Sequence, residues 1–455
     1  MSSEWAEALT IGELLARDGG TVKTGPFGTA LKASEYSEEG VPLISVREIG
    51  HGSFHIDSKT PRISKATLAR LPEYILREGD VVFARKGGIE RCALITSRQD
   101  GWFLGSDGIR VRPPSTCDAR FIAYSLQTSA VKEWLVQNST GSTMASLNQA
   151  TIGRLPLTLP ARYEQTKIAD LLEALDHRIT LLRETNATLE AIAQALFKSW
   201  FVDFDPVRAK AEGRQPEGMD ATTAALFPDS FEESELGLVP KGWGIKSVAE
   251  VAEVVKGKSY TSKELAEQHD TALVTLKSFA RGGGFRLDGF KPYTGSYKPA
   301  QVVVPGDLII AYTDVTQAAE LIGKPAIVIG VEDYQTLVAS LDVGIVRPDI
   351  QKVSRQYLYG LFRTESFQSH TFAHTSGTTV LHLAKDGVGS YQFPCPPNEI
   401  IQSFSVITDA LSERCQNNID QVRNLTQLRD TLLPRLISGQ LRLPEAEALM
   451  AEVAS

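Results

Sequence analysis

Apolar side chains recur at alternating steps of four and three residues along the segment Glu164–Phe201. This is the spacing of the a and d positions of a coiled coil, and neither glycine nor proline interrupts it. The recurring positions are Ile168, Leu172, Leu175, Ile179, Leu182, Asn186, Leu189, Ala193, Leu196 and Trp200. The pattern predicts one helix of roughly 57 Å, at about 1.5 Å per residue, whose apolar seam needs a partner. The polar Asn186 either fixes the register of that pairing or lies at a solvated position.

A second long helical pattern runs from Ile400 to Ile437 near the C-terminus. Its seam is less regular and is formed by Phe404, Ile407, Leu411, Cys415, Ile419, Val422, Leu425, Leu428 and Leu432. We predict that this helix is the partner of the first one within the same chain.

The two helices belong to an internal duplication. A shift of about 236 positions brings the second helix onto the first and places Ser376–Thr379 on Thr140–Thr143. Similar shifts align Asp342–Pro348 with Gly108–Pro113, and Pro305–Ile310 with Glu78–Phe83. Such a repeat predicts two copies of one unit, each a globular segment followed by a long helix.

Short apolar runs bounded by glycine, proline and charged residues indicate strands in both globular segments. In the first segment, about Thr10 to Pro160, they are Val41–Val46, Asp80–Ala84, Cys92–Ile95, Gly108–Val111 and Leu155–Pro160. In the second, about Lys246 to Pro397, they are Val302–Val304, Asp307–Tyr312, Ala326–Ile329 and Gly344–Val346. Helical spacing appears in Lys65–Leu71, Ala119–Gln137 and Arg355–Ser369. We therefore predict an α+β fold: two similar β-rich domains joined by two long helices that form an antiparallel intramolecular coiled coil with pseudo-two-fold symmetry.

Composition narrows the class of protein. The 455 residues are 42% hydrophobic and 22% charged, which is an ordinary globular balance. No leader-like segment and no long apolar run is evident, so we expect a soluble, cytoplasmic protein without a membrane partner. The four cysteines are scattered, which predicts neither a zinc site nor a disulfide framework.

The net charge of −8 is unevenly distributed. The linker Asp203–Glu235 holds nine acidic and three basic residues, and the segment after Pro444 is acidic as well. The rest of the chain is nearly neutral, which leaves room for basic patches on the globular segments.

Loops rich in Gly, Ser, Thr, Lys and Arg lie between the predicted strands. Cationic side chains neutralise phosphates, hydroxyl groups and backbone amides position a duplex, and arginine can read guanine. These loops are Val22–Gly28, Ser45–Glu48, Ala84–Gly88 and Asn138–Thr143 in the first segment, and Val255–Tyr260, Leu276–Ser278, Tyr312–Asp314 and Thr375–Thr379 in the second. The alternative is that they are ordinary polar loops of a β-rich domain.

Enzyme signatures are missing from the sequence. It contains no GxxxxGK[ST], HExxH or GxSxG motif. Its glycine-rich runs do not join a strand to a helix in a βαβ unit. We therefore predict no catalytic residue, no metal site and no cofactor.

The run Ala195–Lys210, which reads ALFKSWFVDFDPVRAK, follows the first long helix and resembles the central conserved region of type I restriction-modification specificity subunits. Leu432–Leu441 resembles the distal conserved region of that family, and the likeness covers the whole chain. One departure is Asn398–Glu399, in place of the usual Glu-Gln before the second helix, which shifts the expected helix start by about one residue.

The resemblance implies a non-catalytic recognition subunit. Residues 1–160 and 241–397 would be two target recognition domains, 161–240 and 398–444 the conserved regions with the long helices, and 445–455 an acidic tail. Each domain would read one half of a bipartite site in double-stranded DNA. The helices would set the spacer and dock two adenine-N6 methyltransferase (modification) subunits, and ATP-dependent restriction subunits would join the complex.

By position, we predict DNA contacts from both segments. In the first they are Lys23, Thr24, Arg47, Arg85, Lys86, Ser142 and Thr143, and in the second Lys256, Lys258, Lys277, Thr313, Thr378 and Thr379. Phe197, Trp200 and Phe201 are candidates for the partner interface, with a core role as the alternative. Two rival classes are a coiled-coil scaffold without sequence-specific DNA binding and a self-contained methyltransferase. The latter would need a cofactor glycine motif and an Asn/Asp-Pro-Pro-aromatic motif, and Asp205–Val207 does not supply it.

Overall fold

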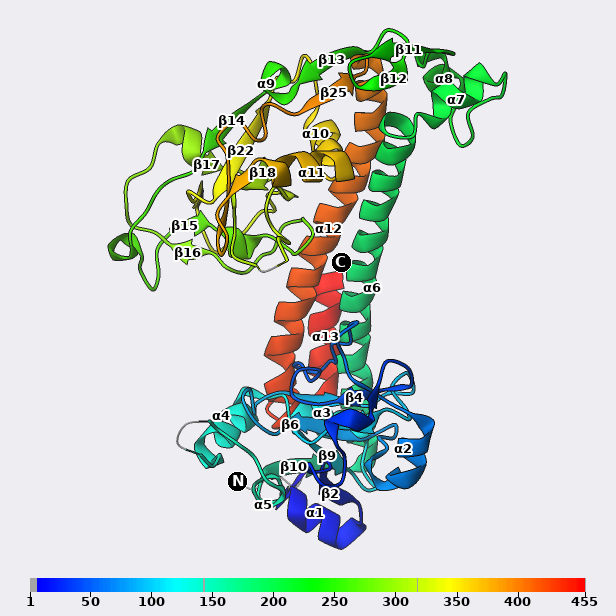
Figure 1. Cartoon of the computed structure of the whole chain (residues 1–455). Helices are drawn as coiled ribbons and strands as arrows, with labels where there is room; N and C mark the ends of the chain where they lie inside the picture. Colours follow the sequence, from blue (N-terminus) through cyan, green and yellow to red (C-terminus); the bar gives the residue numbers. More distant parts are fainter. Residues whose placement is uncertain (1–5, 142–143, 317, 455) are drawn as a thin grey trace. The chain divides into compact units, whose positions relative to one another are not determined.

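The computed structural model describes residues 6–141, 144–316 and 318–454 of the chain. It contains two compact units (Figure 1). Unit 1 comprises Met1–Leu182 and Asp420–Ser455, and unit 2 comprises Arg183–Ile419. Helices α6 (Arg162–Phe201) and α12 (Asn398–Ile437) contribute residues to both units.

Unit 1 is built from short strands and helices around one end of each long helix. Its strands are β1 (Ala6–Thr10), β2 (Thr21–Thr24), β3 (Tyr36–Ser37), β4 (Val41–Ile44), β5 (Arg62–Ile63), β6 (Val81–Ala84), β7 (Cys92–Leu94), β8 (Phe103–Leu104), β9 (Gly108–Arg112) and β10 (Pro156–Pro160). Its other helices are α1 (Ile11–Asp18), α2 (Lys65–Arg70), α3 (Ala119–Ser125), α4 (Ser129–Asn138), α5 (Gln149–Gly153) and α13 (Leu443–Ala454). Local signals start several of them: the Thr10 hydroxyl accepts from the amide of Glu13 in a capping box, and the Asn148 side chain caps α5.

The strands of unit 1 form three sheets. An antiparallel sheet has the order β2-β9-β6-β7, a second sheet the order β3-β5-β4-β8 with β4 and β8 parallel, and β1 pairs with β10. The unit's main core lies between the first sheet, α3, α5 and the long helices.

Unit 2 repeats this plan and adds an insertion before it. Its strands are β11 (Phe231–Ser234), β12 (Gly237–Pro240), β13 (Gly244–Ser247), β14 (Ala252–Lys256), β15 (Thr271–Val274), β16 (Lys291–Pro292), β17 (Val302–Val303), β18 (Leu308–Ala311), β19 (Thr313–Asp314), β20 (Pro325–Ile327), β21 (Thr336–Ala339), β22 (Val343–Pro348), β23 (Thr375–Ser376), β24 (Leu381–Leu383) and β25 (Gln392–Cys395). Its other helices are α7 (Asp205–Ala211), α8 (Ala221–Leu226), α9 (Val248–Val251), α10 (Arg355–Phe362) and α11 (Glu365–Ala373).

Sheet topology confirms the duplication. The sheet β14-β22-β18-β20 has the strand order and directions of β2-β9-β6-β7, and β13-β25 matches β1-β10. In the sheet β16-β15-β21-β17, the central pair β15 and β21 is parallel, as β4 and β8 are. An additional small sheet, β19-β24-β23, and the hairpin β11-β12 complete unit 2.

The duplication extends to single atoms. Arg112 donates from Nε and Nη2 to the buried carboxylate of Asp80, at 2.6 and 2.7 Å. At the equivalent place in unit 2, Arg347 lies 2.5 Å from a carboxylate oxygen of Asp307. Each carboxylate also accepts a backbone amide three residues before it, from Arg77 and Val304 respectively. An equivalent turn and an equivalent ion pair therefore precede the equivalent strands β6 and β18.

The long helices confirm the predicted antiparallel pair. Each is 40 residues long and begins two residues before its predicted start. In unit 1 the first half of α6 packs with the second half of α12, where Arg429 donates to Asp176 at 2.7 Å. In unit 2 the second half of α6 lies against the first half of α12. The two helices therefore run in opposite directions.

The seam contains more polar residues than the apolar pattern predicted. Asn186 does not lie at a solvated position; it donates to the carbonyl oxygen of Cys415 at 3.1 Å and accepts from Asn418 at 2.7 Å. Ile407, predicted in the seam, is exposed, and the neighbouring Thr408 is buried instead. The Thr408 hydroxyl donates to the carbonyl of Phe404, so it needs no partner across the seam.

Two predicted helices are each broken into two. Ala119–Gln137 is α3 and α4, and Arg355–Ser369 lies within α10 and α11. At both breaks a threonine hydroxyl donates to the carbonyl three residues before it: Thr128 to Ser125, and Thr364 to Leu361. This bond ends the first helix and fixes the turn into the second.

Two further segments have structure that the sequence analysis did not specify. The acidic linker holds the helices α7 and α8 and leads into the hairpin β11-β12. The segment expected as an acidic tail lies largely in α13, whose Ala446 is buried in the core of unit 1. In the described part of the chain, no helix has the length and apolar character required to cross a membrane.

Candidate nucleic-acid interface

Two of the polar loops predicted in unit 1, Val22–Gly28 and Ala84–Gly88, meet at one edge of the sheet β2-β9-β6-β7. The amide of Arg85 donates to the carbonyl of Asp107, and the amide of Leu147 donates to the carbonyl of Arg85, both at 2.8 Å. Gly25 donates to Gly108 at 3.0 Å. The ends of β2 and β6, the start of β9 and the segment after α4 therefore form one continuous surface, which we call edge 1.

The same hydrogen bonds occur in unit 2. Tyr312 donates to Asp342, and Leu383 donates to Tyr312, both at 2.8 Å. Gly257 donates to Val343 at 3.0 Å. This equivalent surface is edge 2, and it places Tyr312 where unit 1 has Arg85.

A second pair of turns is also equivalent. The amide of Glu48 donates to Ser45 at 3.1 Å, and the amide of Ser278 donates to Thr275 at 2.9 Å. Arg47 and Lys277 occupy the same position within these turns. The two edges thus share a backbone frame and carry different side chains on it.

Glycine is required where the first strand of each frame leaves its sheet. A Cβ atom at Gly25 would overlap the carbonyl oxygen of Gly105, and one at Gly257 would overlap that of Ser340. Close approach of two backbones is a position where only glycine fits. Gly28, two residues beyond the following proline, faces open space.

Three of the predicted cations of unit 1 have carboxylate neighbours. Lys23 Nζ lies 4.0 Å from Glu73 and over the ring of Tyr74, Arg47 pairs with Asp57, and Lys86 Nζ lies 3.6 Å from Asp107. Such exposed pairs are weak and can exchange for phosphate. Thr24 Oγ1 accepts from Gln149 at 3.2 Å. Ser142 and Thr143, also predicted to contact DNA, lie outside the described residues.

Arg85 differs from these three. Its guanidinium carbon lies 4.7 Å from the ring centroid of Phe27, and its Nη1 donates to the carbonyl of Ser106 at 3.4 Å. Phe27 is 54% exposed and was missed by sequence reasoning, because a single aromatic residue in a glycine-rich loop carries no periodic signal.

Edge 2 presents its predicted residues unequally. Lys256, Lys277, Thr378 and Thr379 are exposed, and Lys258 is partly exposed. Thr313 is only 6% exposed, and its hydroxyl lies 3.4 Å from Nδ1 of His382. In the present arrangement Thr313 therefore has little surface to offer a ligand, and His382 was not predicted as its neighbour.

The aromatic residues proposed for a partner interface lie inside unit 2. Phe197, Trp200 and Phe201 are 2%, 5% and 7% exposed. Their rings contact one another, Phe404 and Tyr357 at centroid distances of 5.0 to 6.0 Å. The core role is the one that this packing supports, so these side chains are not an exposed docking surface.

Each globular part is attached to the long helices by a tyrosine. In unit 1, Tyr124 of α3 donates to Asp176 of α6 at 2.8 Å, and burial raises the pKa of this tyrosine together with the Asp176 charge. In unit 2, Tyr359 of α10 donates to Glu190 of α6 at 2.6 Å, with Arg363 on the same carboxylate. These contacts orient each edge relative to its own portion of the helix pair.

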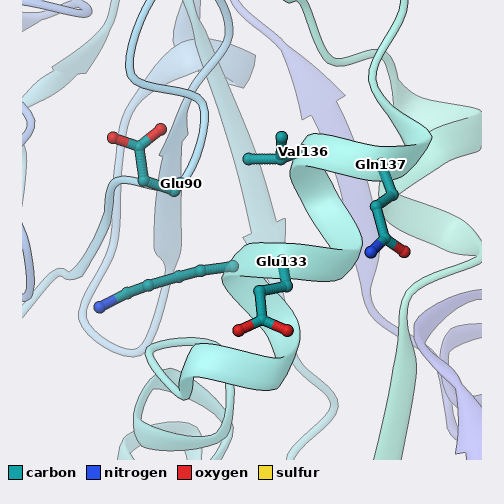
Figure 2. A pocket seen from close by; sticks show the side chains of 5 residues that line it. Glu90, Glu133, Val136 and Gln137 are labelled. Carbon is teal, nitrogen blue, oxygen red and sulfur yellow. The ribbon is translucent and has the colours of Figure 1, made fainter.

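A separate hollow of about 290 Å³ lies on unit 1 against α4, with Glu90 on a facing loop (Figure 2). It is lined by Glu90, Lys132, Glu133, Val136 and Gln137. This wide, mixed-charge hollow gives no indication of a catalytic or cofactor site. Among the described residues, no group of three or more His, Cys, Asp or Glu side chains is arranged to hold a metal ion.

Comparison with known proteins shows which class of protein the chain is similar to. The family model described as "Type I restriction modification DNA specificity domain" matches residues 23–191. The chain is 24% identical over 421 residues to the HindI specificity subunit of Haemophilus influenzae, covering 80% of this chain and 87% of that one. It is 24% identical to the MjaIX specificity subunit of Methanocaldococcus jannaschii, covering 91% and 90%.

A solved structure supports the fold. The type I restriction-modification S subunit from M. genitalium matches 96% of this chain and 97% of its own with a TM-score of 0.56, at 13% identity. Over most of its length the chain is similar to specificity subunits of type I restriction-modification systems.

Proposed function

We propose that this chain is the non-catalytic sequence-recognition subunit of a type I restriction-modification complex, and that edges 1 and 2 each read one half of a bipartite DNA site. The observation that carries the proposal is the repeated frame: the same backbone hydrogen bonds hold both edges, while Arg85 and Tyr312, or Arg47 and Lys277, differ at equivalent positions. Phosphate contacts position a protein on DNA and side-chain contacts to base edges select the sequence. A shared backbone frame with different side chains is what two related surfaces need in order to recognise different DNA half-sites.

The chemistry of the complex would lie in its partners. We propose that two modification subunits supply adenine-N6 methylation, that ATP-dependent restriction subunits supply translocation and cleavage, and that the complex works in the cytoplasm. The long helices would dock the modification subunits through their exposed faces. The buried Phe197, Trp200 and Phe201 would support that surface from within rather than touch a partner.

The deciding experiment is single-molecule methylation sequencing of the source genome, with and without deletion of the gene for this chain. We expect a split motif, with N6-methyladenine in both halves, that disappears on deletion. A motif that persists without the chain would contradict the proposal.

A coiled-coil scaffold remains the second candidate, because the paired helices alone would serve it. It predicts that the purified chain, together with any methyltransferase that co-purifies with it, binds duplexes of different sequence equally. Equal binding of motif-containing and scrambled duplexes at a fixed salt concentration would favour the scaffold.

A further inference from the structure

Arg85 is set apart from the other predicted cations of unit 1 by what surrounds its charge. Lys23, Arg47 and Lys86 each have a carboxylate within 4.0 Å. Arg85 has none among the residues that the structure describes. Among the described residues its charge therefore has no carboxylate partner, while its backbone bonds to two other segments of edge 1, at Asp107 and Leu147.

Two contacts nevertheless orient the guanidinium of Arg85. Its carbon lies 4.7 Å from the Phe27 ring centroid, and Nη1 donates to the Ser106 carbonyl. The backbone on both sides is fixed, because the amide donates to Asp107 and the carbonyl accepts from Leu147. Stacking on an aromatic face and a tethered backbone reduce the conformational entropy lost on binding.

The tether also selects which edge of the guanidinium is presented. With Nη1 bonded to Ser106, the Nε and Nη2 hydrogens form the remaining bidentate edge. Arg112 in the same unit uses that edge on the carboxylate of Asp80, at 2.6 and 2.7 Å. A fork of two parallel donors matches the O6 and N7 acceptors that guanine displays in the major groove.

The ring beneath Arg85 is held as firmly. Phe27 follows the close-packed Gly25 and a buried proline, and its carbonyl accepts from Ala30 at 2.7 Å. Phe27 is 54% exposed and gains little from burial. Its ring contacts the guanidinium of Arg85 instead.

We propose that Arg85 is the side chain with which unit 1 reads guanine, and that Phe27 is its positioning residue. The inference rests on the proposed function and assigns one base pair of one half-site. At the equivalent position unit 2 has Tyr312, whose ring packs against Gly344 and whose burial, with the charge of Asp386, raises its pKa to about 12. That side chain cannot supply a donor fork, so this position contributes guanine recognition to one half-site only.

The test uses the full chain expressed with its own modification subunits in a host that lacks them, followed by methylation sequencing. The variants are Arg85→Ala, Arg85→Lys, Phe27→Leu and Phe27→Tyr. Arg98→Ala is the matched control, since Arg98 is an exposed arginine in the loop after β7, a loop that bonds to the residues before β6 and not to those after it. In the wild type we expect a split motif with a G·C pair at one position that Arg85→Ala makes degenerate, while the other half-site is unchanged.

The graded variants separate reading from positioning. Arg85→Lys keeps the charge but loses the fork, so it should relax the same position. Phe27→Leu should relax that position partly, and Phe27→Tyr, which keeps an aromatic face, should restore it. With purified complexes, discrimination between duplexes with G·C and A·T at that position should fall from about 10- to 100-fold toward none in Arg85→Ala.

Several outcomes would overturn the inference while leaving the proposed function intact. One is a wild-type split motif that Arg85→Ala does not change, and another is a relaxed position that is an A·T pair. A third is uniformly weaker methylation at every motif site, which would make Arg85 a phosphate contact. If the wild-type chain produces no split motif, the proposed function fails and this inference fails with it.

Discussion

Buried polar side chains are placed in the same way in both halves of the molecule. Asp80 and Asp307 are each buried, each pairs with an arginine of the strand β9 or β22, and each accepts a backbone amide from its own turn. A buried carboxylate is stable only when it is paired and hydrogen-bonded. Each of these residues therefore holds a turn, a strand and an adjacent strand together.

Removing either arginine should destabilise its unit. We expect Arg112→Met and Arg347→Met each to lower the free energy of unfolding by about 3 kcal/mol, because the buried carboxylate loses its counter-ion. Urea unfolding followed by circular dichroism measures this. Asp57→Ala, which removes the exposed partner of Arg47, should cost less than about 1 kcal/mol. Equal losses in all three variants would contradict the argument.

Glycines at the edges give a second prediction at the residue scale. Gly25→Ala and Gly257→Ala should each cost about 1–3 kcal/mol, since the added methyl group meets backbone atoms that cannot move aside. Gly28→Ala is the control and should change the melting temperature little, because a Cβ there faces open space. A neutral Gly25→Ala variant would show that the loop can shift.

His370 should make the stability of unit 2 depend on pH. Its ring centroid lies 4.1 Å from that of His374, and its Nε2 lies 3.1 Å from the Ser390 hydroxyl. Burial lowers the pKa of His370, and the neighbouring His374 lowers it further. The unfolded chain, with an ordinary histidine pKa near 6.5, takes up the proton at higher pH than the folded chain does. Stability contributed by the neutral ring is thus present above that value and is lost as pH falls toward the folded pKa.

The measurement is the urea midpoint between pH 7.5 and 5, compared with His370→Gln. The wild type should lose more stability over this range than the variant does. Parallel curves would mean that His370 titrates alike in both states.

At the scale of elements, the two long helices were the most predictable part of the chain and their seam the least regular. Heptad spacing predicted both helices to within two residues, because a long apolar period has few competing explanations. The sequence did not predict that Thr408, rather than Ile407, is the buried residue of the seam. A threonine can be buried there because its hydroxyl donates to a carbonyl of its own helix. The sequence did not predict the helix breaks at Thr128 and Thr364 either. A threonine is compatible with a helix, and here it ends one because its hydroxyl donates to the carbonyl three residues before it.

The site was predictable in the same partial sense. Polar loops between strands indicated which segments hold the candidate residues, and the duplication indicated that there would be two sets. Contacts between distant segments decide whether a cationic side chain has a carboxylate neighbour. Arg47 meets Asp57 in this way, whereas Arg85 meets the ring of Phe27. Such contacts have no signal within a single stretch of sequence.

The asparagine pair in the seam gives a prediction at the element scale. Asn186→Leu should cost about 1–3 kcal/mol, because it leaves the buried side chain of Asn418 without its acceptor. The double variant Asn186→Leu/Asn418→Leu should recover most of that loss or exceed the wild type. A double-mutant cycle by urea unfolding measures the coupling, and additive losses would contradict it.

At the scale of the whole molecule, we expect the long helices to act as a spacer. Removing one heptad from α6 and a matching heptad from α12 should change the number of unread base pairs between the half-sites and leave both half-sites unaltered. The reason is that edges 1 and 2 take their side chains from the globular parts and not from the helices. Methylation sequencing of DNA from cells that express the shortened protein measures the spacer length and both half-sites at once. An unchanged spacer would contradict the role of the helices as a spacer.

The division of the chain between the units also sets an order of events during synthesis. Unit 2 is one continuous segment, Arg183–Ile419, whereas unit 1 needs Asp420–Ser455 to cover the seam of α6 and to fill its core with Leu432, Leu436 and Ala446. Domains fold as units during synthesis, and translation makes all of unit 2 before the residues from Asp420 onward that close the core of unit 1. A chain that stopped at Ile419 would therefore hold every residue of unit 2 but leave the core of unit 1 open. A closed core in unit 1 thus implies that the segment carrying edge 2 has already been made.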